Sequence, residues 1–239
     1  SLPEKPVVPK AIIAPHAGYV YSGPIAASVY ARLAPAAASI RRVVLLGPTH
    51  RVGVQGLALP SATHFMTPLG AVAIDADGAA QLADLPQVVV ADPPHAQEHS
   101  LEVQLPFLQF VLANFRVLPL AVGHVSANAV AEVLDRLWGG PETLIVVSSD
   151  LSHYLPYAAA QEIDATTASR IVALDPHIAH DEACGATPVN GLLLAAARHG
   201  LRAERIDLRN SGDTAGDRSR VVGYGAFAFV GGDGSRDGE

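Results

Sequence analysis

The chain is poor in cysteine and in clustered charge, and both shortages narrow its possible functions. A single cysteine among 239 residues excludes an intramolecular disulfide framework and leaves one free thiol, which fits a reducing compartment. The net charge is −7, and lysine and arginine form no run longer than the Arg41-Arg42 pair. Partners that bind basic surfaces, namely nucleic acids and anionic membranes, are therefore not expected.

Long hydrophobic runs are also missing. No apolar run approaches the roughly 18 residues that a membrane helix requires, and no charged-then-apolar signal stands at the start. We expect a cytoplasmic protein without a membrane partner. Hydrophobic residues make up 49% of the chain, enough to bury a substantial core, so we expect one domain over residues 1–239. Its ordered body should span about residues 10–230, because prolines in SLPEKPVVPK and glycines in GGDGSRDGE favour loop-like ends.

Short β-branched apolar runs alternate with helix-forming stretches along the body. This alternation predicts a largely parallel sheet that is covered on both faces. The predicted fold class is α/β, as a three-layer α/β/α sandwich with a mostly parallel central sheet. The predicted strands are 10–15, 42–46, 87–91, 115–122, 143–147, 202–208 and 221–230, with a hairpin or short strands within 57–74. The predicted helices are 25–33, 77–85, 100–113, 126–137, 157–174 and 188–199.

Side chains that bind metals follow three of the predicted strands. His16 ends AIIAPH, His50 ends RVVLLGPTH, and Asp150 and His153 lie in TLIVVSSDLSH. In an open α/β sheet, ligands and catalytic groups gather at the C-terminal edge of the strands. A single histidine there would often be an ordinary half-buried residue, but the repetition favours a site.

Asp150 and His153 are three residues apart. If a helical turn follows the strand, this spacing puts both groups on one face, where the carboxylate could coordinate a metal or orient a catalytic imidazole. The alternative is an Asp150 that caps a helix and a His153 that faces solvent. The neighbouring serines suggest a hydrolase, but the sequence contains no G-x-S-x-G elbow.

Three further residues are candidates for the same pocket. Cys184 precedes a predicted helix, whose N-terminus would lower the pKa of the thiol and favour the metal-binding thiolate; a lone cysteine is otherwise most often a small buried hydrophobe. His99 either lines the pocket or satisfies a backbone carbonyl. Tyr19 shares a loop with His16.

The polar residues elsewhere are given ordinary roles. Glu102 and Gln104 are predicted to be surface or sheet-edge groups. The other histidines, which lack an evident strand-end position, are predicted to be surface or structural residues: His64, His95, His124, His177, His180 and His199.

Six motifs in order resemble the Memo family, known in prokaryotes as AmmeMemoRadiSam system protein B: APHAGYVYSGP, GPTH, QEHSLEVQLPFL, SSDLSHY, ACGATPVNGLLLAA and NSGDTAGDRSRVVGYGAFAF. The resemblance covers residues 10–230. This family is similar to the class III extradiol dioxygenases, which are non-haem iron enzymes with an α/β/α fold. The resemblance implies metal ligation by His16, His50 and Cys184, with Asp150 and His153 in the same pocket and His153 in the acid/base position. The family name also implies an association with a radical SAM protein and a second companion protein.

The sequence departs from these patterns in two ways. Family members usually begin with an additional N-terminal segment, so a segment could be missing here. The dioxygenases complete their iron site with a carboxylate where this family has a thiolate, and a thiolate favours copper or zinc.

Three functions follow as hypotheses. The first is an iron- or copper-dependent oxidoreductase, dioxygenase-like, that acts on an unknown small substrate, with His153 moving protons and Asp150 orienting it. The second is a non-catalytic metal- or peptide-binding module. The third is a zinc-dependent hydrolase, in which His153 would be the base.

Overall fold

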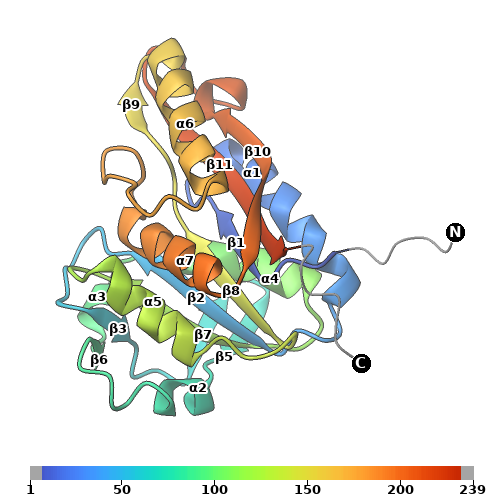
Figure 1. Cartoon of the computed structure of the whole chain (residues 1–239), viewed down its shortest axis with the longest axis vertical. Coiled ribbons are helices and arrows are strands. Elements are labelled where there is room, and N and C mark those ends of the chain that lie inside the picture. The colour runs from blue at the N-terminus through green and yellow to red at the C-terminus, as the bar shows by residue number, and fades with distance from the viewer. Residues whose placement is uncertain (1–6, 233–239) are drawn as a thin grey trace, which may run out of the picture.

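The computed structural model describes residues 7–232, and within them the α/β/α sandwich is confirmed (Figure 1). The loop-like ends that the sequence predicts fall largely at 1–6 and 233–239, outside the described residues. None of the helices in the described part of the chain is long and apolar enough to cross a membrane.

Nine strands form the central sheet, in the order β10-β11-β1-β8-β2-β7-β3-β6, with β9 paired to β11. The four central strands β1, β8, β2 and β7 are mutually parallel, whereas β11 and β3 flank them in antiparallel pairing. The bounds are β1 Ala11–Ala14, β2 Arg42–Pro48, β3 Leu57–Leu59, β6 Val88–Val90, β7 Arg116–Val122, β8 Thr143–Ser148, β9 His153–Leu155, β10 Leu201–Asn210 and β11 Val221–Gly231, with a separate hairpin of β4 His64–Thr67 and β5 Gly70–Ala73.

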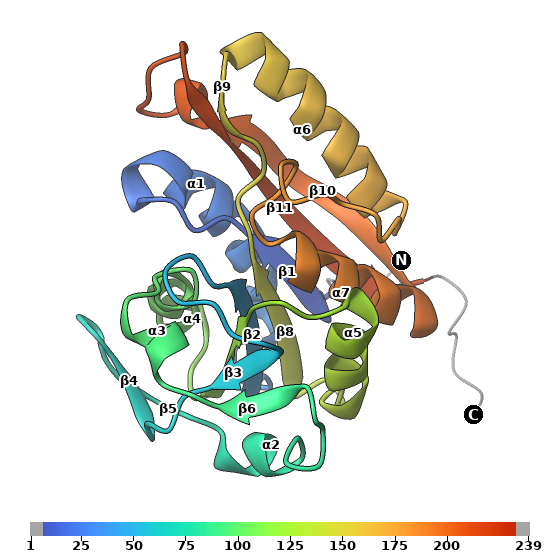
Figure 2. The ribbon, with the colours of Figure 1, turned by 90° about the vertical axis from the view of Figure 1, so that its left-hand side faces the viewer.

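Helices cover both faces of the sheet, as Figure 2 shows with α1 and α4 on one side and α5, α6 and α7 on the other. Alternation along the strands fills the two interfaces: Ile13 packs in the core under α5–α7, and its neighbour Ile12 packs under α1 and α4. The bounds are α1 Tyr19–Tyr30, α2 Ala76–Ala80, α3 Pro93–Ala96, α4 Leu105–Val111, α5 Ala127–Arg136, α6 Tyr157–Val172 and α7 Ala186–Arg198.

Three local expectations are wrong. Helix α1 begins at Tyr19, six residues ahead of the predicted start at residue 25, and the Ser22 hydroxyl donates to the Ala17 carbonyl at 2.8 Å. The predicted helix 100–113 is a 3₁₀ turn followed by the shorter α4, whose first turn contains Pro106. The segment after Asp150 is not a helical turn, because His153 starts β9 and pairs with Val222 of β11.

The outer edge of the sheet at β6 is short and exposed. Its three residues include Val90, which is 68% exposed. A three-residue edge offers few backbone groups to another strand, which limits edge-to-edge association.

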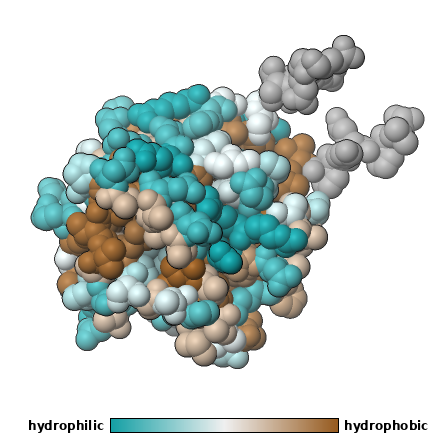
Figure 3. All heavy atoms as spheres, turned by 90° about the horizontal axis from the view of Figure 1, so that it is seen from below, coloured by the Kyte–Doolittle hydropathy of each residue, from teal (hydrophilic) through white to brown (hydrophobic). Residues whose placement is uncertain are grey.

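The face drawn in Figure 3 carries separate hydrophobic patches among polar areas.

Gly123, just after β7, is required by close backbone packing. A Cβ there would lie 2.1 Å from the Val54 carbonyl oxygen, whereas a Cβ on Gly53 would meet nothing within 4 Å. We therefore expect Gly123→Ala to lower the free energy of unfolding by about 1–3 kcal/mol, since the backbone must shift. Urea denaturation measures this, with Gly53→Ala as the control. Equal stability of the two variants would contradict this packing.

Candidate metal centre

The four central strands each deliver a polar side chain to the same edge of the sheet. His16, Asp150, His50 and His124 lie two residues beyond the ends of β1, β8, β2 and β7 respectively. Because these strands are parallel and adjacent, the expected gathering of His16, Asp150 and His50 is confirmed. The view that His124 lacks a strand-end position is wrong.

A buried carboxylate orients the His50 ring. Glu98 accepts hydrogen bonds from the His50 Nδ1 at 2.9 Å and from the His50 backbone N–H at 2.5 Å. Burial opposes ionisation of Glu98, but hydrogen bonds from His50 and from the Ser100 backbone lower its pKa to about 2. The hydrogen bond to Glu98 also raises the pKa of His50, against the effect of burial. The ionised carboxylate places the proton on Nδ1, so Nε2 is the atom that faces the pocket.

A second network orients His16, which is 2% exposed. The Ser148 hydroxyl donates to the Ser100 carbonyl at 2.5 Å, so it must accept from the His16 Nδ1 at 2.9 Å. Gln104 donates to the same hydroxyl at 2.8 Å. Burial lowers the pKa of His16, although the Asp150 charge opposes this. His16 is therefore a neutral imidazole whose Nε2 is an acceptor, with the Cys184 Sγ 3.5 Å away.

Cys184 reaches this edge because Gly185 packs directly on the end of β8. A Cβ on Gly185 would lie 2.7 Å from the Ser149 Cβ, and the Gly185 N–H donates to the Ser149 hydroxyl at 2.9 Å. The Cys184 Sγ lies 3.5 Å from the His16 Nε2. Contrary to the expected effect of the helix N-terminus, burial and then the Asp150 charge raise the pKa of Cys184 to about 12.

These positions bring three potential ligand atoms together. One ligand atom each from His16, His50 and Cys184 lies within 4.8 Å of the other two. A tetrahedral ion with typical bonds to nitrogen and sulfur would separate the two ligand atoms by about 3.6 Å, close to the Sγ–Nε2 distance of 3.5 Å. The arrangement is thus able to hold a metal ion.

His99 lies at the mouth of the same cluster. Its ring centroid is 5.8 Å from that of His50 and 5.6 Å from that of His16, and its side chain is 55% exposed. Together with Glu98 and His50 it forms a second group of potential ligands. Of the two roles that the sequence left open for His99, the structure favours lining the pocket.

Asp150 and His153 are not partners. Asp150 accepts from the backbone N–H groups of His16 at 2.7 Å and Ala17 at 3.3 Å, and its Oδ2 lies 3.9 Å from the His16 Nε2. The His153 Nδ1 donates to the Leu151 carbonyl at 2.8 Å. Among the described residues no hydrogen bond joins Asp150 to His153, because the chain enters β9 and carries His153 toward β11.

Tyr19 packs among the aromatic side chains of α1 and α4. Its hydroxyl donates to the Val103 carbonyl at 3.1 Å, and its ring lies edge-on to Phe107. It lines an apolar hollow of about 560 Å³ with Tyr30, Phe107 and Phe110. None of the described residues that line this hollow is a histidine.

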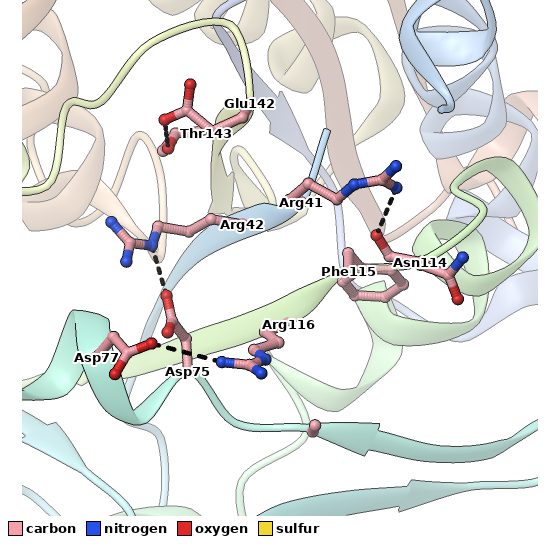
Figure 4. A pocket seen from close by; sticks show the side chains of 10 residues that line it. Arg41, Arg42, Asp75, Asp77, Asn114, Phe115, Arg116, Glu142 and Thr143 are labelled. Atoms are coloured by element: carbon pink, nitrogen blue, oxygen red, sulfur yellow. Dashed lines mark hydrogen bonds and ion pairs between the residues drawn. The ribbon is translucent and has the colours of Figure 1, made fainter. Parts of the chain in front are cut away.

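In a charged hollow at the opposite edge of the sheet, two of the three lining arginines pair with carboxylates (Figure 4). Arg42 pairs with Asp75, and Arg41 donates to the Asn114 carbonyl at 3.3 Å. Arg116 lies 3.5 Å from Asp77. These contacts tie the starts of β2 and β7 to neighbouring segments.

Sequence reasoning missed the residues that orient the two histidines. Glu98 is 7% exposed, and Gln104, predicted to be at the surface or a sheet edge, is fully buried. The Gln104 amide donates hydrogen bonds to the Ser148 hydroxyl and, at 3.0 Å, to the Pro15 carbonyl. Its oxygen accepts one from the Tyr30 hydroxyl at 2.8 Å. A carboxylate next to a histidine in QEHS was the one available signal for Glu98.

The lowered pKa of Glu98 predicts acid sensitivity. A carboxyl whose folded pKa lies below its unfolded value adds stability above that unfolded value, near 4.5, and this stability is lost as pH falls toward 2. Glu98→Gln should therefore be less stable at neutral pH and show a flatter dependence across this interval. Urea denaturation of the metal-free protein measures it, with the exposed Glu162→Gln as control. Parallel pH curves for Glu98→Gln and wild type would refute this.

Comparisons with known proteins agree with this architecture. A family model described as "Memo-like protein" matches residues 1–228. A MEMO1 family protein of Aquifex aeolicus is 36% identical over 95% of this chain and 88% of its own length, and one of Methanosarcina barkeri is 38% identical over 90% and 84%. An uncharacterized protein, JW3007 of Escherichia coli K12, shares the fold in its crystal structure, with a TM-score of 0.58, 13% identity and coverage of 90% of this chain and 98% of its own. The chain therefore belongs to the Memo-like protein family.

Proposed function

We propose that this chain is a metal-dependent oxidoreductase whose metal ligands are His16, His50 and Cys184. The observation that carries the proposal is the convergence of these three side chains within 4.8 Å at one strand edge. The hydrogen bonds that fix both imidazoles give further support, since metal-binding histidines usually donate their other ring N–H to a fixed acceptor.

The protonation states of the donors suit a cation. His16 presents an unprotonated Nε2 because its Nδ1 proton is held by Ser148. Cys184 is a neutral thiol in the free protein, and a bound ion would displace its proton. Asp150, with an oxygen 3.9 Å from the His16 Nε2, adds a negative charge beside the ligands.

The donor set favours iron or copper over harder ions, and zinc is also compatible with it. Two imidazoles and one thiolate combine borderline and soft ligands, which disfavours magnesium and calcium. Iron or copper would supply one-electron chemistry toward dioxygen and a small substrate, whereas zinc would supply only Lewis acidity.

The protein's own contribution is proton movement and positioning. His153 donates from Nδ1 to the Leu151 carbonyl, so its Nε2 is free to accept a proton. We assign His153 the acid/base role. Asp150 instead holds the His16 loop through two backbone hydrogen bonds, which fixes the ring next to Cys184.

Removing a proposed ligand should empty the site. We expect wild type and the control His177→Ala, at an 81% exposed side chain, to bind one ion per chain. His50→Ala and Cys184→Ser should lose stoichiometric binding, and wild type should release the Cys184 proton on loading. Metal analysis of protein purified without oxygen, with Co²⁺ thiolate absorption, measures this. Unchanged metal content in Cys184→Ser would refute thiolate ligation.

Removing the proposed acid/base group should have a different effect. We expect His153→Ala to retain its metal but to consume oxygen about 10² to 10⁴-fold more slowly in the iron- or copper-loaded form. If His153→Ala loses metal as completely as His50→Ala, then His153 is a ligand. If both variants keep their metal and neither alters oxygen consumption, the protein is a metal- or peptide-binding module.

A further inference from the structure

A hollow of about 560 Å³ opens beside the proposed ligands, over the ends of β2 and β7. Cys184 lines this hollow, and so does Thr49, the residue before His50 in the chain. Along the strand order β1-β8-β2-β7, the imidazoles of His16 and His50 follow β1 and β2, and the hollow lies over the ends of β2 and β7. Crevices outside the carboxyl ends of parallel strands are the usual ligand sites of open α/β sheets, and the size suits a small molecule.

Two histidines outside the metal ligand set line this hollow. His124 is held by backbone hydrogen bonds on both sides, from its N–H to Val54 at 2.8 Å and from the Gly56 N–H to its carbonyl at 3.0 Å. The His180 Nε2 lies 3.3 Å from the Thr187 hydroxyl, in the first turn of α7. Both histidines are exposed. A fixed backbone and a side chain open to the hollow suit ligand recognition better than core packing.

The lining favours a ligand with negative charge. Imidazole, hydroxyl and amide groups of His124, His180, Thr49, Thr187 and Gln55 can donate hydrogen bonds to it. In the described part of the chain, no acidic residue lines the hollow, and neither does lysine or arginine. The first turn of α7, a helix of 13 residues, adds the positive end of its dipole.

We propose that this hollow is the substrate subsite of the metal centre and that it binds a small organic acid, with the carboxylate held between His124 and His180. The inference rests on the proposed function, since Cys184 links the hollow to the metal. A ligand carboxylate at this place would leave the rest of the molecule near the Cys184 side of the proposed ion.

Benzoate and succinate are suitable probes, with benzamide and succinamide as neutral controls of similar shape. The full chain is titrated with each, and the imidazole carbon-bound proton signals of all ten histidines are followed by NMR. We expect at least one acid to shift the His124 and His180 signals saturably, with the amides much weaker. His124→Asn and His180→Asn should each weaken binding about tenfold, equivalent to about 1.4 kcal/mol. His177→Asn, on the exposed surface, should leave it unchanged.

Three results would overturn the proposal: no saturable shift with either acid, equal binding of the amides, or shifts unaffected by both histidine variants. The metal content of each variant is measured in the same samples. His124 and His180 are not proposed metal ligands. If metal-loaded protein binds neither acid, the subsite is therefore rejected and the metal centre is not. A wild-type chain that never takes up metal but still binds the acid rejects the metal centre alone.

Discussion

The parallel pairing of the adjacent strands β1, β8, β2 and β7 is the constraint on which the site depends. Ala14 pairs with Ser148, and Pro48 pairs with Val122. Because each side chain follows its strand by two residues, His16 is level with Asp150, and His50 is level with His124. Between β8 and β2 the strand ends are offset by one residue, because Leu46 pairs with Val147, so His50 stands one position further along the edge than His16.

Hydrogen bonds to residues behind the two histidines then determine which ring nitrogen of each carries the proton. Ser148 and Glu98 each fix one imidazole tautomer, and both are tied to the segment after Gln97 through Ser100. Gln104 joins this segment to the Pro15 carbonyl. The segment 98–104 thus carries none of the proposed ligands but sets the orientation of two of them.

The strand-end residues were predictable because their signal is local. An apolar β-branched run followed by a short loop indicates where His16, His50 and Asp150 lie, and the same rule, applied evenly, would have included His124. The partners of these residues were not predictable in this way. Glu98 is 48 residues from His50, and Ser148 is 132 from His16, so only the folded chain brings them together. The proposed role of Cys184 as a metal ligand came from the family resemblance, and its pKa depends on burial that its sequence neighbours do not reveal.

The constant two-residue spacing between strand end and side chain also limits how this fold can change its length. Insertions or deletions within those short connections would rotate a proposed ligand away from its neighbours, whereas the stretch after His50, from Arg51 to Gly53, is exposed. Loop lengths can therefore diverge beyond the polar residue but not before it. The same edge could in this way acquire a differently shaped opening while the cluster beneath it keeps its geometry.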